Sequence, residues 1–164
     1  MLDRMRQQQG GSLPEDEARH IIRGVLRFLH QCHSKGIVYR DVKPANFLFL
    51  TRDRWSPVKA SDLGLAVRWR PGDKPLRGES GTLVFMAPEV FIKRYGQEVD
   101  LWSAGCTLHQ MLTGETLFYD EKVKTDKESI IQRIMMEVSP GSSNRNSTTT
   151  TTSYPSGPCG QTTP

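Results

Sequence analysis

Several features that sort chains into broad classes are scarce or absent in this sequence of 164 residues. It holds only three cysteines, widely spaced and without a C-x-x-C pair, which argues against a disulfide framework and against a zinc site. No run of 18 apolar residues is present, so we expect no membrane span. The first ten residues lack the apolar core of a signal peptide. These absences predict an intracellular, cytoplasmic protein that does not associate with a membrane.

An excess of one charge is also missing. The 22 Lys and Arg residues nearly balance the 18 Asp and Glu residues, which leaves a formal net charge of +4. A nucleic-acid-binding surface calls for a stronger basic excess, with aromatic residues among the cations. The basic segment 68–81 contains one aromatic residue, Trp69. We therefore predict that this segment is a solvated loop and that the protein has no nucleic-acid partner.

Hydrophobic residues make up only 36% of the chain, and much of the shortage lies at the C-terminal end. From Ser139 to Pro164, 22 of 26 residues are Ser, Thr, Pro, Gly or Asn. Such a segment cannot bury enough apolar surface to offset the entropy that it would lose on ordering. We therefore divide the chain into an N-terminal remnant at 1–11, a folded part at 12–138 and a disordered tail at 139–164.

The folded part shows helical periodicity and a few short β-like runs. Ser12 to Glu15 has the spacing of a capping box with Pro14 in the first turn, which predicts the start of an amphipathic helix that ends near Gly36. We expect a buried helix at 100–112, closed by Gly114, and another helix at 127–138. Short strands are expected at 37–39, 47–50, 58–60 and 65–67, with a loop at 68–81. The order of the elements indicates an α+β fold that is mainly α-helical.

Chemically versatile residue types gather around the predicted strands. Asp41, Lys43 and Asn46 place an acid, a cation and an amide within six positions, directly before a strand. Asp62, which opens an Asp-Leu-Gly sequence, follows 21 residues after Asp41. Taken alone, each of these residues is most simply interpreted as a solvated turn residue. Together they form an ordered series with three later motifs, Gly81-Thr82, Ala87-Pro88-Glu89 and Asp100-Leu101-Trp102-Ser103-Ala104-Gly105.

This series resembles the larger, C-terminal lobe of the eukaryotic protein kinases, over a stretch from Ser12 to Asp120. Lys43, two positions after Asp41, is similar to the serine/threonine form of the kinase catalytic loop. The stretches HSKGIVYRDVKPANFLFL and KRYGQEVDLWSAG look most like the calcium/calmodulin-dependent and plant-type calcium-dependent kinases. The resemblance implies a protein-kinase-like larger lobe, with the small β-rich lobe missing from this chain.

The resemblance also implies a reaction, in which the γ-phosphate of ATP passes to a Ser or Thr hydroxyl of a protein substrate. ATP is then the co-substrate, Mg²⁺ the cofactor and a protein with a Ser or Thr acceptor the partner. By the same resemblance, Asp41 and Lys43 are catalytic residues. Lys43, Asn46 and Asp62 would bind ATP, and the oxygens of Asn46 and Asp62 would bind the metal.

Three further residues take supporting roles by this resemblance. Thr82 would tie Lys43 to Asp41, Asp100 would brace the backbone of the catalytic loop, and Arg40 would pair with a phosphate on the loop at 68–81.

Other parts of the family pattern are absent from the sequence. It has no Gly-x-Gly-x-x-Gly loop, no Val-Ala-Ile-Lys strand and no helix glutamate to pair with that lysine, and Met1 to Gly11 is too short to contain them. Tyr39 stands where many kinases have His, and Leu63 where many have Phe. The sequence contains no EF-hand loop, so calcium control is not implied.

Three hypotheses therefore stay open. The first is a serine/threonine kinase fragment that retains its catalytic loop. The second is a catalytically incompetent kinase remnant that acts as a protein-binding module. The third is a truncated coding sequence, with the small lobe encoded upstream. The sequence does not determine the oligomeric state.

Overall fold

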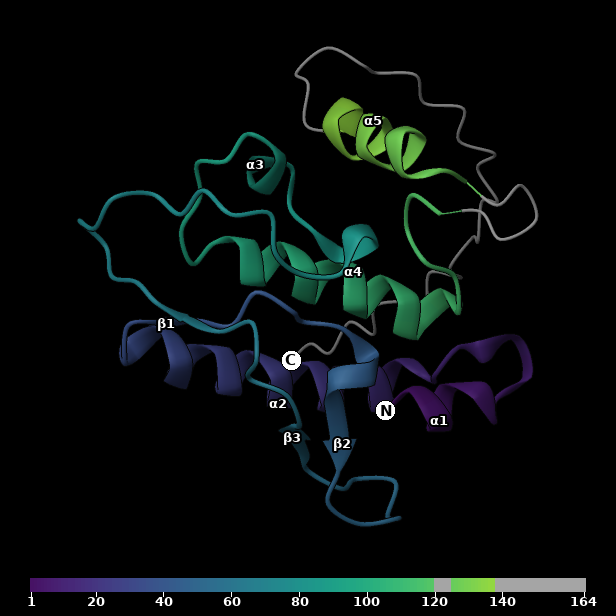
Figure 1. Cartoon of the computed structure of the whole chain (residues 1–164). Coiled ribbons are helices and arrows are strands. Elements are labelled where there is room, and N and C mark those ends of the chain that lie inside the picture. The colour runs from purple at the N-terminus through teal and green to yellow at the C-terminus, as the bar shows by residue number, and fades with distance from the viewer. Residues whose placement is uncertain (120–124, 138–164) are drawn as a thin grey trace, which may run out of the picture.

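The computed structural model describes residues 1–119 and 125–137; the predicted tail at 139–164 lies outside these residues, as does Val138. The described residues form five α-helices and two separate two-stranded antiparallel sheets (Figure 1). The helices are α1 (Leu2–Arg6), α2 (Glu15–Ser34), α3 (Pro88–Phe91), α4 (Val99–Thr113) and α5 (Lys127–Glu137). The strands are β1 (Ile37–Val38), β2 (Phe47–Phe49), β3 (Val58–Ala60) and β4 (Val67–Arg68). The predicted α+β class, mainly α-helical, is confirmed for this part of the chain.

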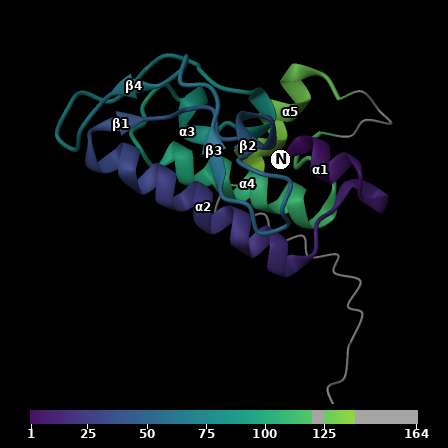
Figure 2. The ribbon, with the colours of Figure 1, turned by 90° about the horizontal axis from the view of Figure 1, so that it is seen from below.

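Helix α2 forms one side of the core because its apolar residues recur at helical spacing. Ala18, Ile21, Val25 and Leu29 are buried on one face, and this face packs against α4 (Figures 1 and 2). The helix ends where Gly36 takes a φ of +69°, as predicted.

The predicted capping box at the start of α2 is wrong. Pro14 occupies the N-cap position, where no side chain caps the helix, and Glu15 is the first helical residue. Three acidic residues in the first turn face the positive end of the helix dipole and stabilise this end instead.

Helix α4, which the sequence predicts as a buried helix, packs against α2. Its inner face is buried, including Ser103, Ala104 and Met111, but Leu101 and Leu112 on the outer face are exposed. The prediction was therefore wrong for that outer face. Gly114 ends the helix with a φ of +78°, as expected of a C-terminal glycine.

The two sheets hold the two ends of the segment that carries Asp41, Lys43 and Asn46. Strand β2 pairs with β3 in the register Leu48↔Lys59, and β1 pairs with β4 in the register Val38↔Val67. The strand expected at 65–67 is shifted to Val67–Arg68, and the loop at 68–81 also makes an isolated bridge from Leu76 to Tyr95. Segment 39–46, which we call the catalytic segment after the roles that the kinase resemblance implies for Asp41 and Lys43, therefore runs from the end of β1 to the start of β2.

The first eleven residues, expected only as a remnant, form α1 and a 3-10 helix at Gln9–Gly11. Met1 and Met5 are buried in the same core cluster as α2. The guanidinium of Arg4 lies 3.6 Å from the centre of the Phe49 ring and also donates to Glu17 Oε1 over 3.0 Å. This segment therefore fastens the β2–β3 hairpin to the start of α2. Among the described residues, no helix combines the length and the apolar character that a membrane span requires.

Candidate active site

The catalytic segment brings Asp41, Lys43 and Asn46 together at the joint between β1 and β2. Asn46 Nδ2 donates to the Asp41 main-chain oxygen over 2.9 Å and to Asp41 Oδ2 over 2.6 Å. Lys43 Nζ lies 2.8 Å from the same Oδ2. The short helical turn at Pro44–Asn46 returns Asn46 towards Asp41, which explains why residues five positions apart meet. Three of the four predicted site residues therefore touch one another.

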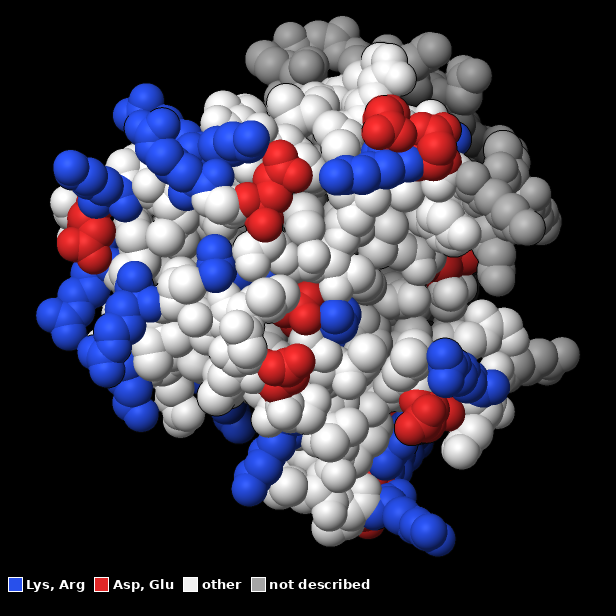
Figure 3. Space-filling view, viewed as in Figure 1, with Lys and Arg blue, Asp and Glu red and all other residues white. Residues whose placement is uncertain are grey.

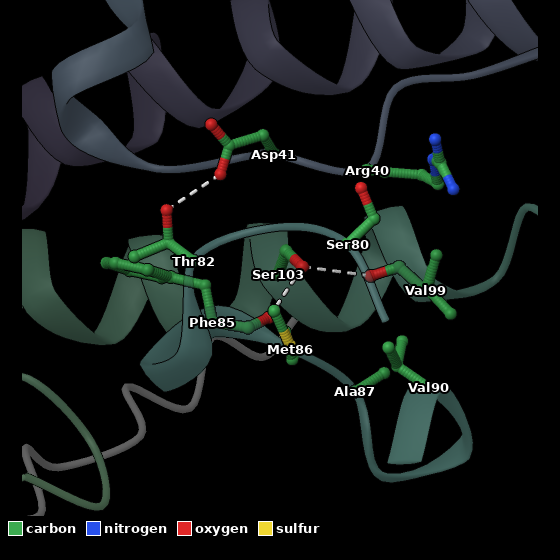
Figure 4. Close-up of a pocket in the computed structure, with 10 residues that line it drawn as sticks. All are labelled: Arg40, Asp41, Ser80, Thr82, Phe85, Met86, Ala87, Val90, Val99 and Ser103. Carbon is green, nitrogen blue, oxygen red and sulfur yellow. Dashed lines mark hydrogen bonds between the residues drawn. The ribbon is translucent and has the colours of Figure 1, made fainter. Parts of the chain in front are cut away.

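Thr82 joins this group from a distant part of the chain. Its hydroxyl donates to Asp41 Oδ1 over 2.8 Å (Figure 4). The same hydroxyl accepts a hydrogen bond from Lys43 Nζ over 2.7 Å. The expected link from Lys43 to Asp41 through Thr82 is confirmed. Thr82 is placed by the 3-10 helix Leu83–Phe85, which directly follows it and packs on α4.

The Asp41 carboxyl is buried yet ionised. Burial alone would raise its pKa, but hydrogen bonds from Lys43, Thr82 and Asn46 stabilise the charged form and together hold the pKa below its ordinary value of 3.8. An acid with a lowered pKa stays a carboxylate at neutral pH and can accept a hydrogen bond or a proton.

Asp100 holds the backbone of the catalytic segment from below. This fully buried carboxylate in the first turn of α4 accepts hydrogen bonds from Tyr39 N over 2.9 Å and from Arg40 N over 2.7 Å. His33 Nε2, at the end of α2, lies 2.7 Å from Asp100 Oδ2. The expected bracing role of Asp100 is confirmed. It also explains how Arg40 keeps a left-handed φ of +68°, a conformation that is strained for a residue with a side chain.

Arg40 itself turns towards the loop at 68–81. Its side chain donates to the Leu65 main-chain oxygen over 2.8 Å and to the Tyr95 hydroxyl over 3.2 Å. The Tyr95 hydroxyl in turn donates to the Gly78 main-chain oxygen. No sequence motif indicated this use of Tyr95, which depends on the bridge between Leu76 and Tyr95. Lys and Arg side chains gather on the side of the molecule where this loop lies (Figure 3).

Asp62, the fourth predicted site residue, does not touch the other three directly, although the preceding residue, Ser61, donates its backbone N–H to the Asn46 main-chain oxygen over 2.9 Å. Asp62 follows β3 and is exposed, and its Oδ1 accepts a hydrogen bond from Gly64 N over 2.7 Å. Among the described residues it makes no hydrogen bond to Asp41, Lys43 or Asn46. Its carboxylate oxygens therefore remain accessible from solvent.

Two of the predicted site residues carry oxygen atoms of the kind that a magnesium ion binds. The side-chain nitrogen Nδ2 of Asn46 donates to Asp41. The side-chain oxygen Oδ1 of Asn46 makes no hydrogen bond within the described part of the chain. Mg²⁺ prefers hard oxygen ligands and keeps several of its waters, so one amide oxygen and one carboxylate suffice on the protein side. Asn46 and Asp62 supply these two ligand types.

Tyr39, at the start of the catalytic segment, packs in the core beneath this site. Its ring meets Phe28 edge-on, with 5.2 Å between ring centres. The hydroxyl is buried and makes no hydrogen bond to any described residue; the Asn46 side chain lies near it without reaching hydrogen-bond geometry. Burial, and next the charge of Asp41, raises the pKa of Tyr39 to about 12. Tyr39 is therefore a neutral packing residue here.

A small cavity of about 10 Å³ lies beside Asp41 (Figure 4). Apolar side chains of Met86, Ala87, Val90 and Val99 form much of its wall. Ser103, which the sequence did not single out by itself, fixes this wall, because its hydroxyl donates to the Phe85 main-chain oxygen over 2.6 Å. The carboxylate of Asp41 is thus bordered by an apolar surface.

Comparison with known proteins matches residues 1–157 to the protein kinase domain. The chain is 42% identical over 131 residues to calcium-dependent protein kinase 29 of Arabidopsis thaliana. This aligned stretch covers 79% of the chain and 24% of that relative. It is 40% identical over 111 residues to calcium-dependent protein kinase 34 of the same plant, and this stretch covers 68% of the chain and 21% of the relative. It is 39% identical over 122 residues to calcium-dependent protein kinase 15 of Oryza sativa subsp. japonica, and this stretch covers 74% of the chain and 22% of the relative. The chain therefore spans less than a quarter of the length of these relatives.

Proposed function

Because the chain belongs to the protein kinase family, we propose that it transfers the γ-phosphate of ATP to a serine or threonine hydroxyl of a protein, with Asp41 at the reacting centre. The observation that carries this proposal is the group formed by Asp41, Lys43, Asn46 and Thr82. It places an ionised acid, a cation and a metal-ligand amide within hydrogen-bond reach of one another. Phosphoryl transfer depends mainly on positioning and on charge neutralisation, and these residue types provide both.

Asp41 is suited to orient an incoming hydroxyl and to accept its proton. A carboxylate offers about four lone-pair positions. Thr82 uses one on Oδ1, and Lys43 and Asn46 use those on Oδ2. The remaining position on Oδ1 can accept the substrate hydroxyl, which thereby points its oxygen at the phosphate.

Lys43, Asn46 and Asp62 are the residues that would hold the phosphates and Mg²⁺. When bound, the metal ion neutralises charge on the phosphate oxygens. Lys43 is half-buried between Asp41 and Thr82, so its ammonium can bind a phosphate oxygen without leaving Thr82. Asn46 offers its side-chain oxygen Oδ1, and Asp62 its exposed carboxylate.

We propose further that the described residues correspond to the larger, helical lobe of a kinase. The supporting observations are the helix-rich fold and the order of the motifs from Asp41 to Asp100. The sequence contains no glycine-rich loop or Val-Ala-Ile-Lys strand. ATP would then contact this chain on one side only, and we expect weak nucleotide binding and slow transfer by the chain alone.

The test compares phosphate incorporation into a generic protein substrate by the purified chain and by Asp41→Asn, with Mg²⁺-ATP. We expect the substitution to lower the initial rate at least about 100-fold, because proton transfer by a positioned group contributes on this scale. Asp73→Asn is the matched control, since Asp73 is exposed in the loop that follows β4, and we expect it to keep the rate. Equal incorporation by the chain and by Asp41→Asn would remove the enzyme assignment.

A further inference from the structure

The segment 68–78, which begins at the last residue of β4, carries most of the net positive charge of the chain. It holds one acidic residue, Asp73, and four cations, Arg68, Arg70, Lys74 and Arg77. Its formal charge is therefore +3, out of +4 for the whole chain, and all five of these side chains are exposed. We call this segment the basic loop. In Figure 3, Lys and Arg side chains gather on the side of the molecule where it lies.

The charge of the basic loop is not neutralised within the described structure. None of its four cations makes an ion pair or a side-chain hydrogen bond with any described residue, and Asp73 makes no ion pair there either. Glu79, the next acidic residue along the chain, lies 3.8 Å from Lys93. The basic loop therefore keeps a positive potential that attracts an anionic ligand.

The basic loop is held in place along its length. Trp69 N donates to the Gly36 main-chain oxygen over 2.9 Å, and the Trp69 indole donates to the Lys74 main-chain oxygen over 3.1 Å. Leu76 exchanges two backbone hydrogen bonds with Tyr95, of 2.8 and 3.2 Å. The cations thus project from an ordered backbone, so a ligand would lose little free energy in ordering the loop.

The end of the basic loop is fixed beside Asp41. The Gly78 main-chain oxygen accepts from the Tyr95 hydroxyl, which itself accepts from Arg40. Ser80, two positions after Gly78, lines the small cavity together with Asp41 (Figure 4). The basic loop therefore leads directly into the site where the proposed acceptor hydroxyl would lie.

Two of the cations lie within reach of a substrate bound there. Arg77 comes three positions before Ser80 and Lys74 six positions before it. These separations span at most about 11 and 21 Å of extended chain. An extended substrate could therefore bring side chains about three to six positions from its acceptor residue to these two cations.

The setting of Trp69 favours a protein ligand over a nucleic acid. Single-stranded nucleic acids bind basic surfaces on which exposed aromatic rings stack with the bases. Trp69 is the one aromatic residue of the basic loop, and it is half-buried against the core cluster that contains Tyr95 and Val99. Its ring lies so close to Gly96 that a Cβ there would come within 2.5 Å of it. The loop thus offers cations without a stacking surface, which suits carboxylates.

We propose that the basic loop binds an acidic stretch of the protein substrate. Its carboxylates would pair with Lys74 and Arg77 while the Ser or Thr acceptor lies at Asp41. The acidic residues would then stand about three to six positions from the acceptor. This proposal rests on the proposed function, because it names the class of protein on which the chain would act.

The test measures fluorescence anisotropy of fluorescein-labelled peptides, added to the full chain without ATP. Each peptide has one Ser among Gly and Ala residues. One carries Glu at the stated positions before the Ser, a second carries Glu after it, and a third carries Gln at both sets of positions. We expect at least one Glu peptide to bind at least about fivefold more tightly than the Gln peptide. Lys74→Glu/Arg77→Glu should abolish this preference.

The matched control is Arg52→Glu/Lys59→Glu, which makes the same change in net charge. Both residues are exposed in the β2–β3 hairpin, away from the basic loop (Figure 1). This variant should keep the preference within about twofold, because solvent and salt screen distant charges. Circular dichroism shows whether each variant is folded, and Lys74→Gln/Arg77→Gln replaces the Glu pair if that variant is not.

Three results would overturn the proposal. The first is equal binding of the Glu and Gln peptides. The second is an equal loss of preference in the control variant, which would show general charge attraction. The third is tighter binding of a single-stranded DNA of the same charge than of either Glu peptide, which would assign the basic loop to nucleic acid.

The binding assay separates this proposal from the proposed function. Asp41→Asn leaves the basic loop unchanged and should keep the preference for the Glu peptide while phosphate transfer is lost. Phosphate transfer by the chain without any preference for Glu peptides would overturn this proposal alone. Selective binding of a Glu peptide by a chain that transfers no phosphate would instead remove the proposed function and keep the acidic ligand of the loop.

Discussion

Thr82 donates its hydroxyl hydrogen to Asp41 Oδ1 over 2.8 Å, although the two residues lie 41 positions apart in the chain. The same hydroxyl accepts a hydrogen bond from Lys43 Nζ. One side chain therefore helps to keep Asp41 ionised, beside Lys43 and Asn46, and also holds the Lys43 cation next to it. The segment that ends in α3 and the catalytic segment are linked at the point where the proposed reaction takes place.

Replacing Thr82 tests this link. Thr82→Val removes the donor to Asp41 Oδ1, so the pKa of Asp41 should rise and phosphate transfer should fall about tenfold. Thr82→Ser keeps the hydroxyl and should stay within about threefold of the unchanged chain. An NMR titration of the Asp41 carboxyl and a rate measurement give independent readings. If Thr82→Ser is as damaging as Thr82→Val, the methyl group rather than the hydroxyl is what matters.

The lowered pKa of Asp41 predicts how stability depends on pH. The folded state holds this carboxyl ionised below 3.8, the value expected in the unfolded chain, so the unfolded chain binds the proton more readily. Asp41 therefore contributes stability that is fully present above 3.8 and is lost as the pH falls through the folded-state pKa. Urea denaturation of the chain and of Asp41→Asn should show a difference in the free energy of unfolding that shrinks below that pH. A difference that stays constant on acidification would contradict the expectation.

Asp100→Asn should destabilise the protein by about 3 kcal/mol, because it leaves buried donors without their charged acceptor. One of the N–H groups of Tyr39 and Arg40 would then face an amide NH₂ group. The free energy of unfolding from urea denaturation checks this value. Asp73→Asn is the control: Asp73 Oδ2 also accepts a backbone N–H, from Arg70, but it is exposed, and a change within about 0.5 kcal/mol is expected.

Tyr39→Phe should leave the free energy of unfolding unchanged or raise it by up to about 1 kcal/mol. The hydroxyl is buried without a hydrogen-bond partner in the described structure, so removing it relieves a desolvation cost. Tyr39→Ala deletes the ring that packs on Phe28 and should cost about 4 kcal/mol. Thermal unfolding of both variants measures the contrast. A large loss in Tyr39→Phe would reveal a hydrogen bond of this hydroxyl in solution.

Replacement by alanine should change the free energy of unfolding in opposite directions at Gly105, inside α4, and at Gly114, which ends this helix. Gly114 has a φ of +78°, and a Cβ there would collide with the Gly10 main-chain oxygen, so Gly114→Ala should cost about 2 kcal/mol or more. Gly105 lies inside the helix with open space around its missing Cβ, and Gly105→Ala should stabilise the protein by about 0.5–1 kcal/mol. Melting temperatures of the two variants provide the comparison. A stabilising Gly114→Ala would show that the N-terminal segment does not pack as described.

The long helices could be predicted from the sequence because periodicity alone specifies them. Helices α2, α4 and α5 each have several apolar residues at helical spacing, and two of them end at a glycine with positive φ. Helix α1 could not be predicted, since five residues do not form a stable helix by local propensity. It exists because Met1 and Met5 are buried and Arg4 binds the β2–β3 hairpin, and these contacts depend on tertiary structure.

The candidate site, too, has a part that could be predicted from the sequence and a part that could not. The closeness of Asp41, Lys43 and Asn46 follows from their short separation, while the contact of Thr82 with Asp41 came from the family resemblance. Asp62 accepts a hydrogen bond from Gly64 N, two residues further on, which is the turn that an Asp-Leu-Gly sequence favours, so its exposed turn could be predicted from the residue types. The roles of Lys43, Asn46 and Asp62 in binding ATP and Mg²⁺ stay predictions.

The hydrogen bonds of Asp100 also bear on how the protein folds. Asp100 lies 61 positions after Tyr39 and 67 after His33, so each of these bonds closes a long loop of chain. We expect such contacts to form late, because the entropy cost of closing a long loop must be met before the contact stabilises the fold. The strained turn at Arg40 consequently cannot take its final shape until α4 has docked on α2. Assembly of the catalytic segment is thus a closing step of folding, and a chain still lacking its docked α4 would have no organised Asp41.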